Sequence, residues 1–348
     1  MSTLPPGASA PRVRIAPSQA DVARLAGVSG QTVSRVANGS ESVLPATRQR
    51  VLDAMNTLGY SPNSAARALR NGTFDTLGII VHKLARTGES RTVDAIVTAA
   101  HQARHTVTLV DVESPSTDEV TAAATRLSHQ AIDGLIIIRA ELERTADLAL
   151  PADLPVVVSD SQFMGQLPSV GSDQISGTRR AVEHLLSLGH QTVHLLAGPQ
   201  DSVPAGTRRR AWADTLAAHD RPIPAPLQGD WTAESGYAAG RAVADDPSIT
   251  AVFSSNDEMA AGLYLALHEQ GVRVPDDVSI VGFDDVPLAT YLWPPLTTVR
   301  QDFGAIGKEL VASLLTQMAG EAPARDALTL IPTELIVRRS TAPPRRRP

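Results

Sequence analysis

Polar side chains follow three apolar runs of the chain, at the point where each run ends. Asp160 follows PVVVS, Asn256-Asp257 follow AVFSS, and Asp284-Asp285 follow SIVGF. Carboxylates and amides are strong hydrogen-bonding groups, so three such positions could together contact a polar ligand. Each position alone is equally well explained as a strand end or a helix cap. If the runs are parallel strands of one sheet, their carboxyl ends share the edge where ligands bind.

An aromatic ring would complete such a site, because a sugar has apolar C–H faces as well as hydroxyls. Aromatic residues make up 3% of the chain, so Trp231, in the sequence Gly229-Asp230-Trp231, stands out. A tryptophan in the core beneath a loop is the alternative. The sequence therefore offers a candidate ligand site without the Gly-rich loops or the Ser, His and Zn motifs typical of enzymes.

The elements that must position these residues alternate between short β-rich runs and amphipathic stretches. Such alternation predicts an α/β fold with parallel sheets covered by helices on both faces. Runs such as GLIII and PVVV fit strands that are buried on both sides. The expected strands are 76–82, 107–112, 134–139, 155–160, 193–198, 251–256 and 278–285. The expected helices between them include 92–104, 118–130, 175–188 and 257–270.

The N-terminal part contains a different candidate site. Ser18 and Asp21 predict a helix N-terminus, and Gly27-Val28-Ser29 predicts a break before a second helix over 30–38. This second helix buries Val33 and Val36. A third helix is expected over 45–58, and its buried face is expected to consist of Val51, Leu52, Met55 and Leu58. The arrangement is a helix-turn-helix whose second helix presents polar side chains, although an ordinary helical hairpin has the same pattern.

Charge is unevenly distributed along the 348 residues. Residues 1–72 carry eight Arg against Asp21, Glu41 and Asp53, a net charge of +5, whereas the whole chain has −6. The remaining residues therefore carry −11. A basic N-terminal part on an acidic body indicates that only the small part binds a polyanion such as DNA.

Several long segments carry a family resemblance. VSGQTVSRVANG, followed by TRQRVLDAMNTLGYSPNSAARALRNG, resembles the DNA-binding headpiece and hinge of the LacI family of transcription repressors. EHLLSLGHQTVHLLAGP, SNDEMAAG, GVRVPDDVSIVGFDD and PPLTTVRQDFGAIG resemble the regulatory core of the lactose-repressor branch of that family. The resemblance implies a headpiece joined to a core that is similar in fold to periplasmic sugar-binding proteins.

The resemblance also implies domain boundaries. Residues 18–62 are expected to form the helix-turn-helix headpiece, 63–73 a hinge helix, and 74–340 the effector-binding and dimerisation core. Residues 1–17, which lack an apolar segment, are independently expected to be a disordered tail. Within the core, the N-subdomain covers about 74–174 and 303–330, and the C-subdomain about 175–302 and 331–340. Three crossover strands join these subdomains, and the effector lies in the cleft between them. Residues 341–348 are expected to be a loose tail.

Two sets of site residues follow from the resemblance. In the core, Trp231 is the plate beneath the sugar, and Arg208 can donate two parallel hydrogen bonds to adjacent hydroxyls. The full effector-binding set is Asp160, Arg208, Trp231, Asn256, Asp284, Gln301 and Phe303, with Phe303 equally well explained as core. In the headpiece, Gln31 and Arg35 would read base edges. The full DNA-binding set is Ser29, Gln31, Thr32, Ser34, Arg35, Asn38, Asn63, Arg67 and Leu69, in which Leu69 would be the minor-groove wedge.

The sequence departs from the branch on one side of the cleft. Ser172 stands where the branch has a pocket Phe, Ile138 replaces a pocket Asn, and His82-Lys83 replace small polar residues. These positions belong to the N-subdomain side, which meets the distal part of the ligand. The polar residues that would bind one hexose ring are therefore present, whereas the sequence does not identify the rest of the effector.

The sequence thus predicts a cytoplasmic homodimeric repressor of sugar-utilisation genes that binds pseudo-palindromic double-stranded operator DNA. A small sugar, expected to be a galactoside, would release it from the operator. The alternatives are a different sugar or a nucleoside acting as co-repressor and, more remotely, a glycoside-processing enzyme. No cofactor, metal or membrane contact is expected, since the chain has no Cys, no apolar run of about 20 residues and no secretory signal.

Overall fold

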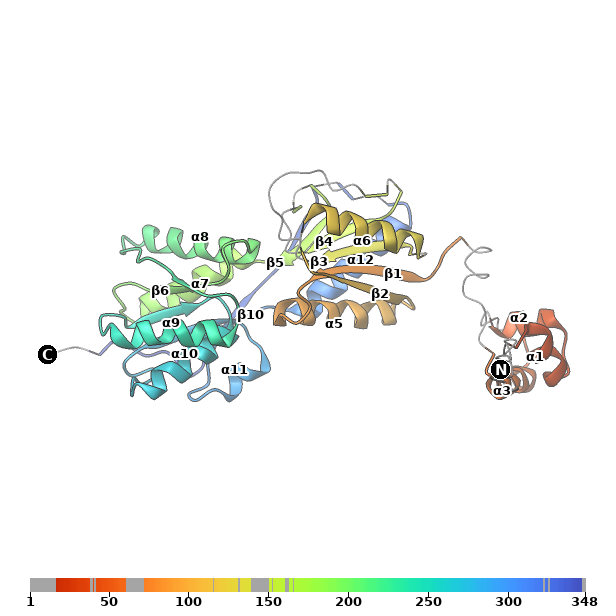
Figure 1. Ribbon diagram of the computed structural model, residues 1–348, viewed down its shortest axis with the longest axis horizontal. Coiled ribbons are helices and arrows are strands. Elements are labelled where there is room, and N and C mark those ends of the chain that lie inside the picture. The colour runs from red at the N-terminus through yellow and green to blue at the C-terminus, as the bar shows by residue number, and fades with distance from the viewer. Residues whose placement is uncertain are drawn as a thin grey trace, which may run out of the picture. The chain divides into compact units, whose positions relative to one another are not determined.

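The computed structural model describes residues 17–37, 40, 42–60, 72–114, 116–130, 132–138, 150–151, 153–159, 163–164, 166–321, 323–324 and 326–345. The chain divides into two compact units, Met1–Phe74 and Asp75–Pro348. Figure 1 shows the elements of both units.

The first unit is a bundle of three short helices, α1 (Gln19–Ala26), α2 (Gly30–Ala37) and α3 (Pro45–Leu58). The Ser18 and Asp21 pair predicted from the sequence forms a capping box at the start of α1. Gly27 ends α1 with φ of 63°, a left-handed conformation that favours glycine. Ser29 then begins α2, because its Oγ accepts a hydrogen bond from Thr32 N at 3.2 Å. The sequence-predicted turn is therefore confirmed.

The core of this bundle differs from the sequence prediction at one position of α3. Val22, Val33, Val36, Val51 and Met55 are buried in one cluster. Leu52 was expected on the same face, but this expectation is wrong: Leu52 is 39% exposed. Ala54 is buried instead, because the helix turns about 100° per residue and places 51, 54 and 55 toward its neighbours.

The second unit contains two six-stranded sheets, of which the first has the strand order β11-β5-β4-β3-β1-β2. Its strands are β1 (Thr76–His82), β2 (Thr106–Val112), β3 (Gly134–Ile138), β4 (Val156–Ser159), β5 (Ser169–Ser172) and β11 (Leu328–Ile331). All their pairings are parallel. Helices α5 (Thr87–Gln102) and α12 (Phe303–Met318) pack on one face, and α6 (Thr117–His129) packs on the other. We call this half the N-subdomain.

The second sheet has the order β12-β10-β9-β8-β6-β7. Its strands are β6 (His194–Ala197), β7 (Leu227–Gln228), β8 (Ala251–Ser254), β9 (Ser279–Asp284), β10 (Thr297–Arg300) and β12 (Glu334–Ile336). Helices α7 (Gln174–Ser187) and α8 (Val203–Ala218) cover one face; α9 (Ala233–Asp245) and α10 (Asp257–Glu269) cover the other. The short helix α11 (Pro287–Tyr291) follows β9. We call this half the C-subdomain.

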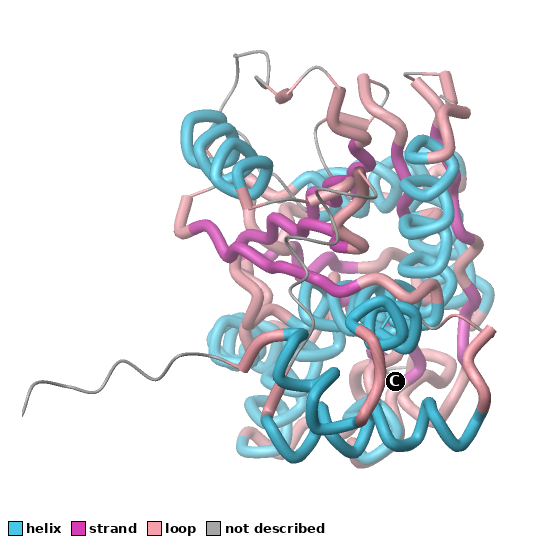
Figure 2. The backbone as a smooth tube through the Cα atoms, turned by 90° about the vertical axis from the view of Figure 1, so that its right-hand side faces the viewer, coloured by secondary structure: helices cyan, strands magenta, loops and turns pink. Residues whose placement is uncertain are grey.

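Three connections join the sheets: β5 to α7, β10 to α12, and β11 to β12. Helices lie on both faces of mostly parallel sheets, as expected from the alternating sequence pattern (Figure 2). The predicted fold class is confirmed. No helix in the described part of the chain is long and apolar enough to cross a membrane.

The C-terminal segment differs from the loose tail expected for 341–348. His184 Nε2 lies 2.9 Å from Thr341 Oγ1, and Ala342 N donates to Ser279 Oγ at 3.0 Å. Arg345 forms ion pairs with Asp276 and Asp277. Residues 341–345 are therefore held against the C-subdomain by polar contacts that spacing in the sequence could not reveal.

Candidate functional site

A small cavity lies where the first turn of α5, in the N-subdomain, faces the strand ends of the C-subdomain. Its volume is about 20 Å³, room for about one water molecule. Among the described residues, this cavity marks the place where the two subdomains face each other across a cleft. Its lining residues are Arg86, Thr87, Gly88, Glu89, Arg208, Trp231, Asn256, Glu258 and Asp284.

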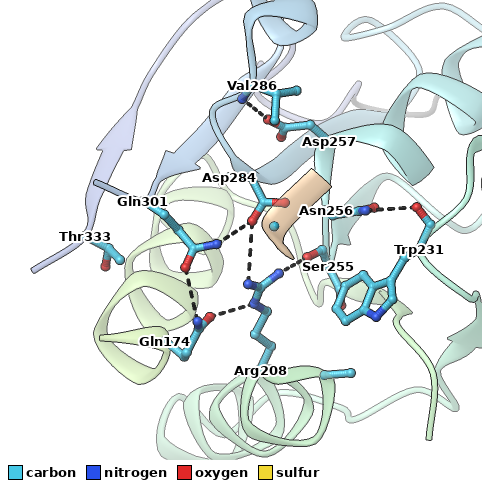
Figure 3. Close-up of polar contacts among 12 residues, drawn as sticks. Gln174, Arg208, Trp231, Ser255, Asn256, Asp257, Asp284, Val286, Gln301 and Thr333 are labelled. Carbon is cyan, nitrogen blue, oxygen red and sulfur yellow. Dashed lines mark hydrogen bonds and ion pairs between the residues drawn. The ribbon is translucent and has the colours of Figure 1, made fainter. Parts of the chain in front are cut away.

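A closed ring of four side chains lies beside this cavity (Figure 3). Arg208 Nε donates to Gln174 Oε1 at 2.8 Å, and Gln174 Nε2 donates to Gln301 Oε1 at 3.2 Å. Gln301 Nε2 donates to Asp284 Oδ1 at 2.6 Å, and this oxygen lies 3.6 Å from Arg208 Nη2. All four side chains are buried. Because Gln174 and Gln301 follow the β5 and β10 crossovers, the ring links the cleft to two of the three connections between subdomains.

Arg208 projects from α8 into this site, and the two arginines that follow it are exposed. Its Nη1 donates to the carbonyl oxygen of Ser255. Its guanidinium carbon lies 3.7 Å from the centroid of the Phe283 ring, and such stacking favours a cation. Arg208 thus presents its donors at the cleft from a position fixed by both packing and hydrogen bonds.

Trp231 lines the cleft and also packs into the core of the C-subdomain. It is 6% exposed and has φ of 79°. A Cβ on Gly198 would lie 2.5 Å from its ring, so only glycine allows the ring this position. Asn256 Nδ2 donates to Trp231 O at 3.0 Å, while Asn256 Oδ1 caps α10 by accepting from Met259 N at 2.9 Å. Trp231 therefore lines the cleft and also packs in the core, and Asn256 lines the cleft and also caps α10.

The N-subdomain contributes the first turn of α5. Thr87 Oγ1 donates to Glu258 Oε1 of α10, a contact that joins the two subdomains across the cleft. Glu89 has no exposed surface, and its Oε1 lies 3.8 Å from Arg86 Nη1. The described residues on this side of the cleft therefore include polar and charged groups.

Asp257 is fully buried and is not among the residues that line the cavity. It accepts from Thr298 Oγ1 at 2.6 Å and from Val286 N at 2.9 Å. Burial first, and then the nearby negative charge of Asp284, raise the pKa of Asp257 well above its ordinary value. Asp257 thus holds the turn after β9, where Asp284 and Asp285 adopt positive φ angles of 113° and 54°.

The structure brings together four of the effector residues proposed from the sequence, Arg208, Trp231, Asn256 and Asp284, with Gln301 hydrogen-bonded to Asp284. Phe303 does not line this cavity. It begins α12 and packs in the N-subdomain core, the alternative that the sequence left open. Asp160 lies outside the described residues.

Sequence reasoning missed Gln174 and the α5 residues of the cleft. Arg86, Thr87 and Glu89 precede or begin a helix that was expected to start at residue 92, so nothing marked them as cleft residues. Gln174 follows Asp173, an N-cap whose type could have located the start of α7. No group of three or more His, Asp or Glu in the described part of the chain could hold a metal ion.

The second helix of the headpiece has an exposed polar face. Gln31 and Arg35 are exposed, and Thr32 and Ser34 are half-buried. Ser29 is exposed, and its Oγ lies 3.0 Å from Thr32 Oγ1. The remaining candidate DNA contacts, Asn38, Asn63, Arg67 and Leu69, lie outside the described residues, as does most of the expected hinge.

Two family models match the chain. Residues 20–63 match bacterial regulatory proteins of the lacI family, and residues 182–341 match a periplasmic binding protein-like domain. Among curated relatives, the lactose operon repressor of Escherichia coli strain K12 is 36% identical over 328 residues, covering 93% of this chain and 90% of that protein. The transcriptional regulator CelR of Thermobifida fusca is 34% identical, covering 92% and 96%.

Solved structures give the same result. A lac repressor dimer bound to operator and the anti-inducer ONPF matches with a TM-score of 0.82 and 35% identity, covering 93% of this chain and 99% of that one. A CelR–cellobiose complex matches with a TM-score of 0.68 and 32% identity, also covering 93% and 99%. The helix-turn-helix unit, the paired α/β subdomains and these relatives lead to one conclusion: the chain belongs to the lacI family of bacterial regulatory proteins, which are DNA-binding transcriptional regulators.

Proposed function

We propose that this protein is a dimeric repressor whose headpieces bind operator DNA and whose core binds a neutral sugar in the cleft between subdomains. The sugar, a galactoside, acts as inducer and releases the operator. The observation that carries the proposal is the ring Arg208–Gln174–Gln301–Asp284 beside the cleft, next to the aromatic ring of Trp231.

The chemistry of this group suits one hexose ring. Arg208 offers N–H donors, Asp284 offers acceptors, and Trp231 offers an apolar plate for C–H groups. The galactoside is favoured because the lactose operon repressor is 36% identical to the chain. The CelR structure is a complex with cellobiose, and another relative is named transcriptional repressor PurR, so a different sugar or a nucleoside is the principal competitor.

Binding of a sugar would change the cleft, because about 20 Å³ cannot hold a hexose. The Thr87–Glu258 contact across the cleft must give way, and sugar hydroxyls would compete for the hydrogen bonds of Arg208 and Asp284. Altered hydrogen bonds of Arg208 and Asp284 would affect the β5–α7 and β10–α12 connections, because Arg208 is bonded to Gln174 and Asp284 to Gln301. A ligand can shift the core only by as much as its affinities for the two arrangements differ.

The headpiece supplies the DNA-binding surface. In this proposal α2 enters the major groove, where Gln31 pairs with adenine and Arg35 pairs bidentately with guanine. Ser29, Thr32, Ser34 and Asn38 contact phosphates. Residues 63–73 form a hinge helix in the dimer on DNA, with Asn63 and Arg67 at the backbone and Leu69 inserted into the minor groove. Two copies are needed to read a pseudo-palindrome with half-sites about one helical turn apart.

Selection of duplexes from a random library with the full-length protein tests the DNA half of the proposal. The enriched sequences are expected to be pseudo-palindromic. Arg35→Ala should weaken binding to the selected duplex by about 1–3 kcal/mol more than binding to random DNA. Equal losses on both duplexes would mean that Arg35 contacts phosphate only, and enrichment of no symmetric site would overturn the dimeric repressor.

Calorimetry with galactose, lactose, glucose, cellobiose and a purine nucleoside tests the effector half. Binding of the galactose series, with release of the selected operator, is the expected result. Binding of only glucosides or the nucleoside would replace the galactoside, and tighter operator binding would make the ligand a co-repressor. Hydrolysis of any glycoside in these mixtures would revive the enzyme alternative.

A further inference from the structure

The ring of four side chains beside the cleft includes residues from two of the three connections between the subdomains, β5 to α7 and β10 to α12. The third connection, from β11 to β12, meets the same part of the C-subdomain through Asp285, which directly follows β9. Its neighbour Asp284 lines the cavity, whereas Asp285 is not among the described residues that do so. Asp285 is therefore next in the chain to a candidate effector residue without belonging to the candidate site.

The Asp285 carboxylate accepts hydrogen bonds from two arginines on different segments of the chain. Its Oδ2 accepts from Arg300 Nε at 2.7 Å, and its Oδ1 accepts from Arg338 Nη2 at 2.6 Å. The Asp285 side chain is only 6% exposed. Charge-assisted hydrogen bonds are about twice as strong as neutral ones, so one at each oxygen fixes the position of this carboxylate.

Each of these arginines belongs to a segment that connects the subdomains. Arg300 is the last residue of β10, from which the chain crosses to α12. Arg338 follows β12, the strand that the connection from β11 enters. The two segments also contact each other, because Arg300 pairs with Glu334 in the antiparallel register of β10 and β12, with Nη1 and Oε2 3.5 Å apart. Asp285 thus joins the second and third connections to the turn that follows β9.

The turn after β9 limits how Asp284 can move. Asp284 and Asp285 have φ angles of 113° and 54°, values that few side chains adopt. Asp284 Oδ1 lies 3.6 Å from Arg208 Nη2 in the cleft. A ligand that displaces Asp284 would also move the Asp285 backbone, because the two residues are consecutive in this turn. The hydrogen bonds of Asp285 to Arg300 and Arg338 would then change as well.

We infer that Asp285 is a positioning residue for the response to the effector. Its two arginine partners transmit a displacement of Asp284 to the β10–α12 and β11–β12 connections, and Asp285 itself contacts no sugar. This inference deepens the proposed function and depends on it. The connections determine how the two subdomains can be oriented, so a change at Asp285 should alter the coupling between sugar and operator. The affinity for sugar depends instead on the residues that line the cleft.

The coupling ratio of the full-length protein tests this inference. The ratio is the Kd for the selected operator with saturating lactose divided by the Kd without lactose, both measured by anisotropy. Asp285→Asn keeps the size of the side chain but has one acceptor oxygen for two arginines, and it should reduce the ratio by about 2- to 30-fold. Its affinity for lactose, measured by calorimetry without operator, should stay within about threefold of wild type. An unchanged ratio would overturn the inference.

Substitutions of two matched arginines separate coupling from stability. Arg300 and Arg273 are 49% and 51% exposed, and Arg273 donates to Asp277 at 2.9 Å in the loop between α10 and β9. Only Arg300→Gln should reduce the coupling ratio, and Arg300→Lys, which keeps the charge, should restore most of it. Equal ratios for Arg300→Gln and Arg273→Gln, with similar losses in thermal unfolding, would reduce the contacts of Asp285 to a structural role. A wild-type ratio of one would contradict the proposed function, and the inference with it.

Discussion

Arg208 Nη2 lies 3.6 Å from Asp284 Oδ1, and the two side chains are 2% and 8% exposed. They come from α8 and from the end of β9, segments 76 positions apart that meet only in the folded C-subdomain. A buried ion pair is weak evidence for stability, because desolvation offsets attraction. Its position at the cleft, with Gln174 and Gln301 completing the hydrogen bonds, is better explained by ligand binding.

Arg208→Met should abolish the response to sugar. The variant keeps an apolar side chain of similar length but removes the guanidinium and its contact with the Phe283 ring. Loss of two charge-assisted hydrogen bonds, at about 1.5–3 kcal/mol each, predicts an affinity at least about 100-fold weaker by calorimetry. The control is Arg209→Met, one residue away on the exposed side of α8. Similar losses in both variants would mean that Arg208 is not the ligand-binding arginine.

Sugar binding should change the tryptophan fluorescence of the protein through Trp231. The chain has three tryptophans. Trp212 is buried and donates to Val193 O at 2.8 Å, and Trp293 is 86% exposed, so only Trp231 lines the cleft. Titration with lactose should give a signal that persists in Trp293→Phe and disappears in Trp231→Phe. A signal that survives in Trp231→Phe would place the ligand elsewhere.

Gly262→Ala should destabilise the core although alanine favours helices. A Cβ at Gly262, in α10, would lie 1.8 Å from Ala233 O and 2.7 Å from Tyr237 N, both in α9. Overpacking of about 1–3 kcal/mol outweighs the gain in helix propensity of about 1 kcal/mol. Gly206→Ala, in α8, is the matched control because a Cβ there meets nothing within 4 Å. Urea denaturation should show a loss for Gly262→Ala and no loss for Gly206→Ala; a stabilised Gly262→Ala would contradict the close packing of α9 on α10.

The stability of the core should fall as the pH drops below about 6.5. Burial lowers the pKa of His184, His190 and His194 below the ordinary value of 6.5. The unfolded chain then binds more protons than the folded chain, so stability rises with pH up to about 6.5 and is lost below it. Each histidine contributes at most about 1.4 kcal/mol per pH unit. Thermal unfolding of wild type and His190→Gln between pH 5 and 8 should show a smaller slope for the variant; parallel slopes would exclude His190 as a contributor.

Elements whose sequence signals lie within a few consecutive residues can be predicted, whereas pairings between distant segments cannot. Gly27 and the Ser18–Asp21 pair act within four residues, so the helix-turn-helix could be predicted accurately. The runs 76–82 and 134–138 are buried on both faces and show as continuous apolar segments. The strands β5 and β11 carry polar residues such as Ser169, Ser172 and Thr329, and their pairing depends on chain segments far apart.

The residues of the cleft also divide into those that the strand pattern predicts and those that it does not. Asn256 and Asp284 end apolar runs, so their place at the sheet edge follows from the pattern of strands. Gln174 and Glu89 could not be predicted, because their role depends on which crossover or helix turn faces the C-subdomain. Phe303 illustrates the opposite case, in which an aromatic residue next to a site residue packs into the core instead.

Reciprocal binding measured on the full-length dimer tests the central claim most directly. Anisotropy of a labelled, selected operator gives its affinity with and without saturating lactose, and calorimetry gives the affinity for lactose with and without operator. Linkage requires both ratios to be equal, and an inducer must make both binding reactions weaker. We predict an equal weakening, of the order of 5–150-fold, that is absent in Arg208→Met. Operator affinity unchanged by a sugar that occupies the cleft would contradict the account.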